Sequence, residues 1–178
     1  MARAPVTWTD FLPETMAALR EPGCLLVSQA EEGKPNAMTI GWGTVGVIWG
    51  RPMFLVLVRH SRYTWRLLEA HDEFTVNVPP IELSEVAVVC GTQSGRDVDK
   101  FAECGLTAVA GQHVRVPVIA ECAVHYECRT VHRSNVDPTH LATSVLDECY
   151  GHGDFHTIYY GHILGVTAAD DAREKLGT

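Results

Sequence analysis

Hydrophobic residues recur with two different periods along the chain, and the pattern predicts a protein rich in strands with a few short helices. Apolar or alternating runs predict strands at Cys24–Gln29, Met38–Trp49, Met53–Val58, Phe74–Val78, Ala120–Val131 and Phe155–Thr167. Met53–Val58 is apolar throughout, as expected for a strand buried on both faces, whereas Phe74–Val78 alternates like a half-buried strand. Helices are predicted at Thr9–Arg20, Tyr63–Ala70 and Glu82–Val89.

Local residues refine these elements. Asp10 is placed to cap the first helix, and Pro13 is tolerated because it falls in the first turn. The Met38–Trp49 run contains Gly41, Gly43 and Gly46, which suit a strand that bends, bulges or lets a ligand approach its backbone. In Ala120–Val131 the alternation puts one set of side chains on one face (Cys122, Val124, Tyr126, Cys128) and another on the opposite face (His125, Glu127, Arg129).

The order of elements favours a mainly β (α+β) domain, because strands and helices do not alternate regularly enough for a doubly wound sheet. The 178 residues, 46% of them hydrophobic, contain no repeat or linker, so residues 1–178 are expected to form one domain. Fourteen Lys and Arg against 22 Asp and Glu give a net charge of −8, which argues against a nucleic-acid binder. No apolar run approaches the roughly 20 residues of a membrane span, and no signal-like core follows the first ten residues. Six separate cysteines without a CxxC pair are expected to be reduced thiols, which favours a cytoplasmic location.

The segment 59–64 (RHSRYT) follows a predicted buried strand and opens a predicted helix. It places two guanidiniums, two hydroxyls and the free amides of a helix N-terminus within six residues, a combination that suits a phosphate. The alternative interpretation is that Ser61 caps the helix and that the arginines are solvated.

The segment 91–96 (GTQSGR) precedes Asp97 and Lys100 and is a second candidate for anion binding. Its small residues and hydroxyls can present backbone amides to an anion, and Lys100 supplies a positive charge. The alternative is a solvated loop before a helix. Two such segments in an acidic chain are expected to converge on one anion.

Several other kinds of site are excluded by their missing motifs. The chain has neither a GxGxxG nor a GxxxxGK loop, so no Rossmann or P-loop nucleotide site is expected. Neither the Cys122/Cys128 pair nor the His152/His156 pair has the spacing and partners of a metal site, and no metal is expected. No GxSxG elbow is present either.

Taken together, five stretches resemble the flavin reductase-like, FMN-binding split-barrel family, and in particular its flavoredoxin-like branch. They are residues 36–42 (NAMTIGW), 59–64 (RHSRYT), 74–79 (FTVNVP), 90–101 (CGTQSGRDVDKF) and 153–161 (GDFHTIYYG). The resemblance covers about residues 10–167. It implies a six-stranded Greek-key barrel with flanking short helices, a homodimer, and FMN near the subunit interface.

The resemblance also implies roles for individual residues. The stretch Asn36, Ala37, Met38 and Thr39 is expected to face the edge of the flavin ring. The phosphate is expected to lie among residues of the two anion-binding segments: Arg59, Ser61, Arg62, Tyr63, Thr64, Ser94, Gly95 and Lys100. Trp42 either walls the ring or packs in the core, and Asn77 either contacts the cofactor or caps its own turn. His156 resembles a histidine that related reductases place beside the nicotinamide, but here one residue separates it from the Gly-Asp pair, so a plain strand-entry histidine is the alternative.

The expected function is that of an FMN-dependent oxidoreductase, which moves electrons from NAD(P)H through FMN to a flavin or a protein acceptor. Hydride chemistry belongs to the flavin, so no acid–base side chain is required. The alternative is a non-enzymatic module that binds or carries FMN.

Overall fold

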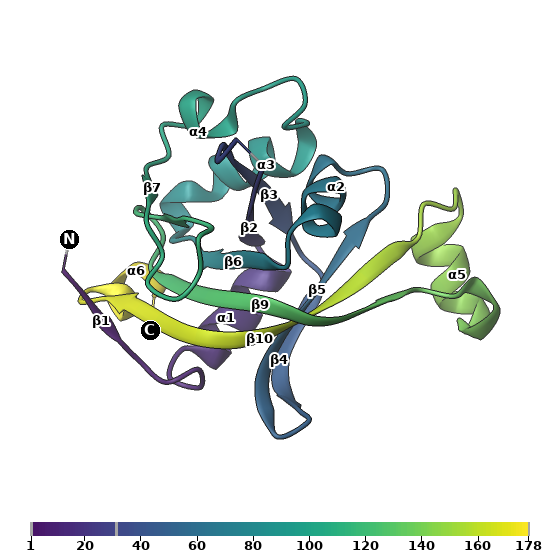
Figure 1. Cartoon of the computed structure of the whole chain (residues 1–178), viewed down its shortest axis with the longest axis horizontal. Coiled ribbons are helices and arrows are strands. Elements are labelled where there is room, and N and C mark those ends of the chain that lie inside the picture. Colours follow the sequence, from purple (N-terminus) through teal and green to yellow (C-terminus); the bar gives the residue numbers. More distant parts are fainter. Residues whose placement is uncertain (1, 31, 178) are drawn as a thin grey trace.

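One curved antiparallel sheet of eight strands organises the chain, and the computed structural model describes it through residues 2–30 and 32–177 (Figure 1). Its strands are β1 (Arg3–Pro5), β2 (Cys24–Gln29), β3 (Pro35–Ile40), β4 (Gly43–Ile48), β5 (Arg51–Arg59), β6 (Glu73–Val78), β9 (Val124–Asn135) and β10 (His156–Ala169). They are ordered β3-β2-β6-β9-β10-β5-β4, and β1 pairs with β10. A separate two-stranded ladder joins β7 (Ala108–Val109) to β8 (Val118–Ile119). The barrel therefore has more strands than the six that the resemblance implied.

The barrel is split between β3 and β4, which are the two ends of the sheet path. Only Gly41 and Trp42 connect these strands, so the chain passes from one end of the path to the other within two residues. The prediction of a single bending strand over Met38–Trp49 was wrong, because the break at these two residues makes two strands that pair with different partners, β2 and β5. The split consequently opens beside Trp42.

Among the residues that the structure describes, six α-helices flank the sheet: α1 (Leu12–Arg20), α2 (Tyr63–Ala70), α3 (Ser84–Thr92), α4 (Lys100–Glu103), α5 (Thr143–Tyr150) and α6 (Ala172–Leu176). Short 3-10 turns, η1 (Ile81–Leu83) and η2 (Pro138–His140), precede α3 and α5. The prediction for α2 was confirmed at both ends, and Pro13 lies in the first turn of α1. Asp10 does not cap α1, because its carboxylate accepts from the N–H and hydroxyl of Thr7 and the helix begins two residues later. Among the described residues no helix is both long and apolar enough to cross a membrane.

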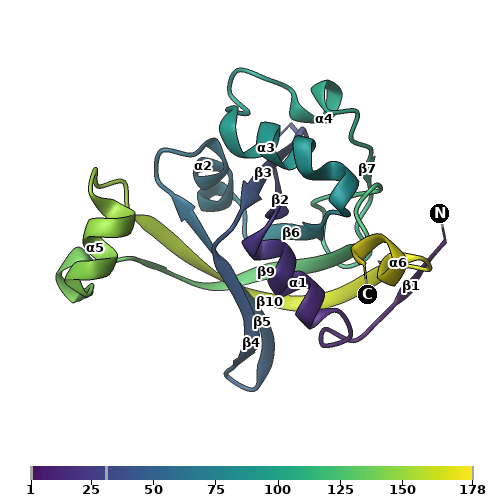
Figure 2. The same ribbon diagram turned by 180° about the vertical axis from the view of Figure 1, so that it is seen from behind.

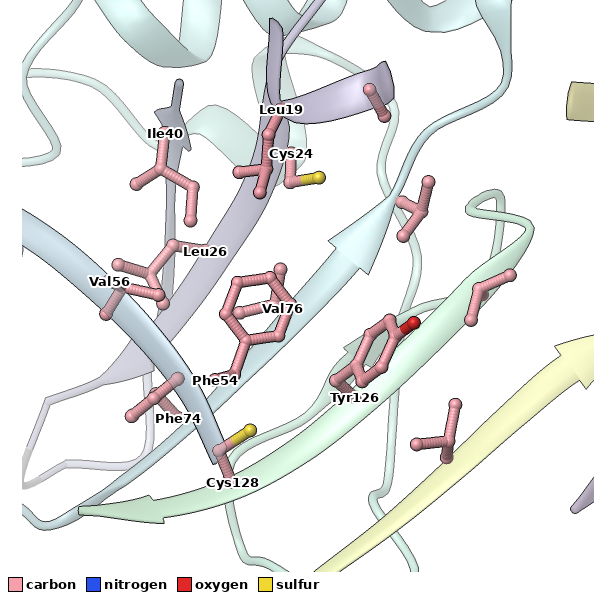
Figure 3. Packing of buried hydrophobic residues seen from close by; sticks show 14 of the residues in the cluster. Leu19, Cys24, Leu26, Ile40, Phe54, Val56, Phe74, Val76, Tyr126 and Cys128 are labelled. Atoms are coloured by element: carbon pink, nitrogen blue, oxygen red, sulfur yellow. The ribbon is translucent and has the colours of Figure 1, made fainter. Parts of the chain in front are cut away.

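The main core fills the inside of the barrel, where the inward side chains of β2, β5, β6 and β9 meet α1 (Figure 3). The Phe54 and Tyr126 rings pack edge to face with centroids 5.3 Å apart, and the Tyr126 hydroxyl hydrogen-bonds Thr15 of α1 at 2.9 Å. A second apolar cluster lies outside the barrel, between β2 and β3 on one side and α3, α4 and the 106–122 segment on the other.

The 106–122 segment also explains why β6 is buried on both faces rather than on one, as its alternation had predicted. Polar side chains on the outer face of β6 and β9 bind the backbone of this irregular segment. The Glu127 carboxylate accepts from the N–H groups of His113 and Val114, and Thr75 donates to the Pro117 carbonyl. The alternating polar residues of these strands are therefore buried, because the 106–122 segment covers them and they hydrogen-bond its backbone groups.

Beyond the barrel, β9 and β10 continue as a two-stranded arm that carries α5 at its far end, away from α6 and both termini (Figure 2). The sequence pattern had not predicted α5. The arm returns to the barrel through residues 151–156, which meet the end of β5 and the start of α2.

Candidate functional site

Two adjoining cavities lie where the two predicted anion-binding segments meet the split in the barrel. The first, which we call the Arg62 cavity, measures about 100 Å³ and is lined by residues 61–64, 90–96, Asn36, Met38 and Lys100. The second, the Trp42 cavity, measures about 200 Å³ and is lined by residues 38–42, Leu57, Arg59, Arg62 and His156. Because Met38 and Arg62 line both, the two cavities lie side by side.

The Arg62 cavity is shaped by contacts between β3, α2 and the 91–96 segment. The Asn36 amide on β3 donates to the Thr64 hydroxyl at 2.9 Å, which leaves the Thr64 proton for an acceptor in the cavity. Gly95 packs directly on this pair, because a Cβ at that position would lie 1.9 Å from Asn36 Oδ1 and 3.0 Å from the Tyr63 ring. Only glycine allows the backbone of the second segment to come this close to the first.

Free amides and guanidiniums give the Arg62 cavity its chemistry. Arg62 is the N-cap residue of α2 and no side chain caps this helix, so the alternative of a Ser61 cap is wrong. Arg62 Nη1 lies 3.5 Å from the Gly91 carbonyl, and the Arg96 guanidinium stacks over the Tyr63 ring at 5.4 Å and donates to the Ser61 carbonyl. Both arginines thus face the gap between the two segments. Uncapped amides at a helix start, together with guanidiniums, suit a phosphate.

The lining residues Cys90–Gln93 and Arg96 were not among the predicted site residues, although all but Cys90 lie within the second predicted segment. Ser94, a predicted phosphate ligand, lines the cavity, and its hydroxyl accepts from the Arg96 N–H at 3.2 Å. The residue types of the segment indicate anion binding in general. Which members face the cavity depends on how the loop folds.

Lys100 lies in the wall of the Arg62 cavity, but it is buried and bound to the protein. Its ammonium donates to the carbonyls of Ala37 at 2.9 Å and of Cys90 at 2.8 Å, so it ties β3 to the end of α3. Burial lowers the pKa of Lys100. Two of its three donors are used in this way, which leaves one for a ligand.

Arg59 and Ser61 bind residues at the point where the arm returns to the barrel. The Ser61 N–H and hydroxyl donate to the two oxygens of Asp154 at 3.1 and 2.6 Å. Arg59 donates to the carbonyls of Asp154 at 2.8 Å and of Cys149 at 3.0 Å. Partial burial would raise the pKa of the Asp154 carboxyl, but the Ser61 hydrogen bonds and the Arg59 charge outweigh it and hold that pKa below its ordinary value.

The Trp42 cavity is walled by flat side chains and by backbone. The Trp42 ring is 41% exposed rather than in the core, and it lies 4.8 Å from the His156 ring. His156 is buried, and its Nδ1 is hydrogen-bonded to the Tyr150 hydroxyl at 2.8 Å. Burial and the nearby Arg59 charge lower the pKa of His156 to about 4, so the imidazole is neutral at physiological pH. Thr39 lines the cavity with its hydroxyl turned to the Ala87 carbonyl.

The structure places Asn77 away from both cavities, inside the sheet. Its amide donates to the Leu25 carbonyl at 3.2 Å and to Thr75, and its oxygen accepts from the Ile119 N–H at 2.9 Å. It neither lines the site nor caps its own turn. Its role is to hold the covering 106–122 segment on β6.

Comparison with known proteins gives concordant matches. The family profile described as "Flavin reductase like domain" matches residues 16–177. An uncharacterized protein of Archaeoglobus fulgidus is 37% identical over 146 residues, which are 82% of this chain and 71% of that protein. Among solved structures, the flavoredoxins of Desulfovibrio vulgaris and Methanosarcina acetivorans each share 26% identity and a TM-score of 0.68. Both matches cover 84% of this chain, with 70% and 69% of the respective flavoredoxins.

Proposed function

The chain belongs to the flavin reductase-like family, and we propose that it is an oxidoreductase that binds FMN across the two adjoining cavities. The observation that carries the proposal is that the cavities adjoin: a cationic, amide-rich cavity shares Met38 and Arg62 with one walled by Trp42 and His156. FMN has the same two parts, a phosphate and a flat ring. Both solved structures named above are flavoredoxins, which supports the assignment.

The residues of the Arg62 cavity fit a phosphate. Arg62 and Arg96 supply the positive charge, and Thr64, Ser94 and the first amides of α2 supply further donors. Local positive charge is needed because the chain carries a net charge of −8, which opposes the binding of a phosphate dianion. The absence of a Cβ at Gly95 lets the second segment close on Asn36, and so sets the size of the cavity.

The residues of the Trp42 cavity fit a flat ring. The backbone of residues 38–42 runs along one side, where Gly41 adds no side chain, and Trp42, Leu57 and His156 complete the wall. When bound, FMN supplies the hydride and electron chemistry. The protein binds and orients the ring, and His156, held neutral, meets it as a hydrogen-bonding group that carries no charge.

We propose a reduced nicotinamide as the electron donor and a flavin or protein as the acceptor. The chain has no Rossmann loop to hold a nicotinamide, so Trp42 and His156 are the residues beside which the donor would bind. The family resemblance and the exposed Val47 and Trp49 of the β4–β5 hairpin support a homodimer. Light scattering of the FMN-loaded protein is expected to give twice the monomer mass, and the monomer mass would contradict the dimer.

An anaerobic visible spectrum before and after addition of NADH, and separately of NADPH, tests this function. The protein with added FMN is expected to show bound oxidised flavin that one of the two nicotinamides bleaches. Bound flavin that neither bleaches would favour a module that only binds or carries FMN. Absence of any bound flavin would overturn the proposal as a whole.

A further inference from the structure

The turn at Gly153 and Asp154 contacts both ends of the site. The Asp154 carboxylate holds Ser61, a residue that lines the Arg62 cavity. The backbone of the same turn is held by Arg59, whose guanidinium also lies over the rings of Trp42 at 5.7 Å and Tyr150 at 5.2 Å. The next residues lead directly into His156.

Both hydrogen-bond donors of Ser61 are used in this contact. A serine has one N–H and one O–H, and each donates to a different oxygen of the Asp154 carboxylate. A phosphate placed against the Ser61 hydroxyl would lie beside a carboxylate of the same charge sign. Ser61 is therefore committed to Asp154, unlike Arg62 and Thr64, which still have donors for the cavity.

The backbone conformation of the turn is an uncommon one that needs stabilising contacts. Asp154 has φ of 55° and follows Gly153 at 73°, so two consecutive residues are in the left-handed region. Asp is among the few residues other than glycine that adopt this region readily, and it remains a sparsely populated one. The contacts with Ser61 and Arg59 fix it from two sides.

We propose that Ser61 and Asp154 form a latch that positions His156, which lines the Trp42 cavity, and its hydrogen-bond partner Tyr150, and that Ser61 serves this latch rather than the phosphate. The inference rests on the proposed function, because His156 is a residue beside which the electron donor would bind. Ser61 and Asp154 are positioning residues in this account. They act on the donor through Arg59, Tyr150 and His156.

Three variants and one matched control test the latch. Ser61→Ala removes the hydroxyl donor and keeps the backbone N–H donor, and Asp154→Asn removes the charge of the acceptor while keeping a residue that tolerates a positive φ. The third variant combines both changes. Asp10→Asn is the control, because Asp10 accepts from the N–H and hydroxyl of Thr7 in the same two-oxygen pattern, outside both cavities.

Hydrogen exchange of the whole protein reports on the latch without any turnover. Amides of residues 149–157 are expected to exchange at least tenfold faster in Ser61→Ala and in Asp154→Asn, and at the wild-type rate in Asp10→Asn. The double variant is expected to match the single variants, because each single change already removes or weakens the same hydrogen bond between the Ser61 hydroxyl and the Asp154 carboxylate. Unchanged exchange in both single variants would overturn the latch.

Flavin binding and donor kinetics then separate the two possible roles of Ser61. Ser61→Ala is expected to change FMN and riboflavin affinity by the same factor, while KM for the nicotinamide rises at least fivefold in each single variant. A loss of affinity for FMN alone would indicate that Ser61 is a phosphate ligand and would overturn the assignment. An unchanged KM for the nicotinamide would also overturn it. If wild-type protein binds no flavin, the proposed function fails, whereas the exchange result still decides whether the latch exists.

Discussion

The Asn36 amide and the Thr64 hydroxyl are joined by a 2.9 Å hydrogen bond that ties β3 to the first turn of α2. The two residues are 28 positions apart, and each belongs to a different stretch that the sequence had marked as part of a flavin site. Both residues line the Arg62 cavity, so their contact shapes the proposed phosphate end of the site.

Arg62→Ala is expected to weaken FMN binding by about tenfold to a hundredfold, because a charge-assisted hydrogen bond contributes about 1.5–3 kcal/mol. Riboflavin, which lacks the phosphate, should bind the variant almost as well as it binds the wild type. Titration by flavin fluorescence measures both affinities. Arg66→Ala is the control, because Arg66 lies on the same helix and lines neither cavity. Equal losses for FMN and riboflavin would show that Arg62 supports the fold rather than the phosphate.

Gly95→Ala is expected to weaken FMN by more than about tenfold, because the new Cβ would lie 1.9 Å from Asn36 Oδ1 and force the Asn36–Thr64 bond apart. Gly46→Ala provides the comparison, since a Cβ at Gly46 meets no atom within 4 Å. Calorimetric titration of both variants with FMN measures the effect. Wild-type affinity in Gly95→Ala would mean that the 91–96 segment does not close on β3 as described.

Much of this site could be predicted from the sequence, because its chemistry is concentrated in short segments. Arg59–Thr64 carries an anion-binding composition at the start of a helix, and a helix start is itself a local signal. The position of α2 was accordingly confirmed. The family itself was also confirmed, by a profile that matches residues 16–177.

Partners that come from distant parts of the chain could not be predicted. Nothing local to Ser61 indicates that Asp154, 93 positions away, takes both of its donors. Lys100 has the charge expected of a phosphate ligand, yet the fold buries it against two carbonyls. Trp42 looked compatible with the core, and it is exposed because the split in the barrel opens beside it.

Asn77→Ala is expected to lower the free energy of unfolding by about 2–4 kcal/mol, because it removes the side-chain acceptor of the buried Ile119 N–H and a donor to the Leu25 carbonyl. Urea denaturation measures this loss. FMN affinity, measured well below the unfolding midpoint, should stay within about twofold of the wild type. A large loss of FMN affinity without a loss of stability would indicate that Asn77 contacts the cofactor.

Acid is expected to destabilise the protein through His125, which is buried beneath the 106–122 segment and hydrogen-bonded to the Ile119 carbonyl. Burial lowers the pKa of His125 to about 3, so the folded protein keeps it neutral while the unfolded chain protonates it below about 6.5. Because the unfolded state then binds more protons, stability falls as pH drops through this window. His125 alone accounts for a loss of about 2 kcal/mol between pH 7 and pH 5.

His156 acts in the same direction, because the pKa of His156 is lowered to about 4. Denaturation curves of wild type and His125→Gln at both pH values separate the two histidines. The variant is expected to lose about half of the pH dependence, and a wild-type pH dependence in His125→Gln would contradict the role given to His125.

The central claim is that the two adjoining cavities form one site, which takes the phosphate of FMN at Arg62 and its ring beside Trp42. The most direct measurement is a paired titration of the wild-type protein with FMN and with riboflavin under identical buffer conditions. Binding of one FMN per chain, at least tenfold tighter than riboflavin, is the predicted result. No binding of FMN at tens of micromolar, or equal affinity for the two flavins, would contradict the account.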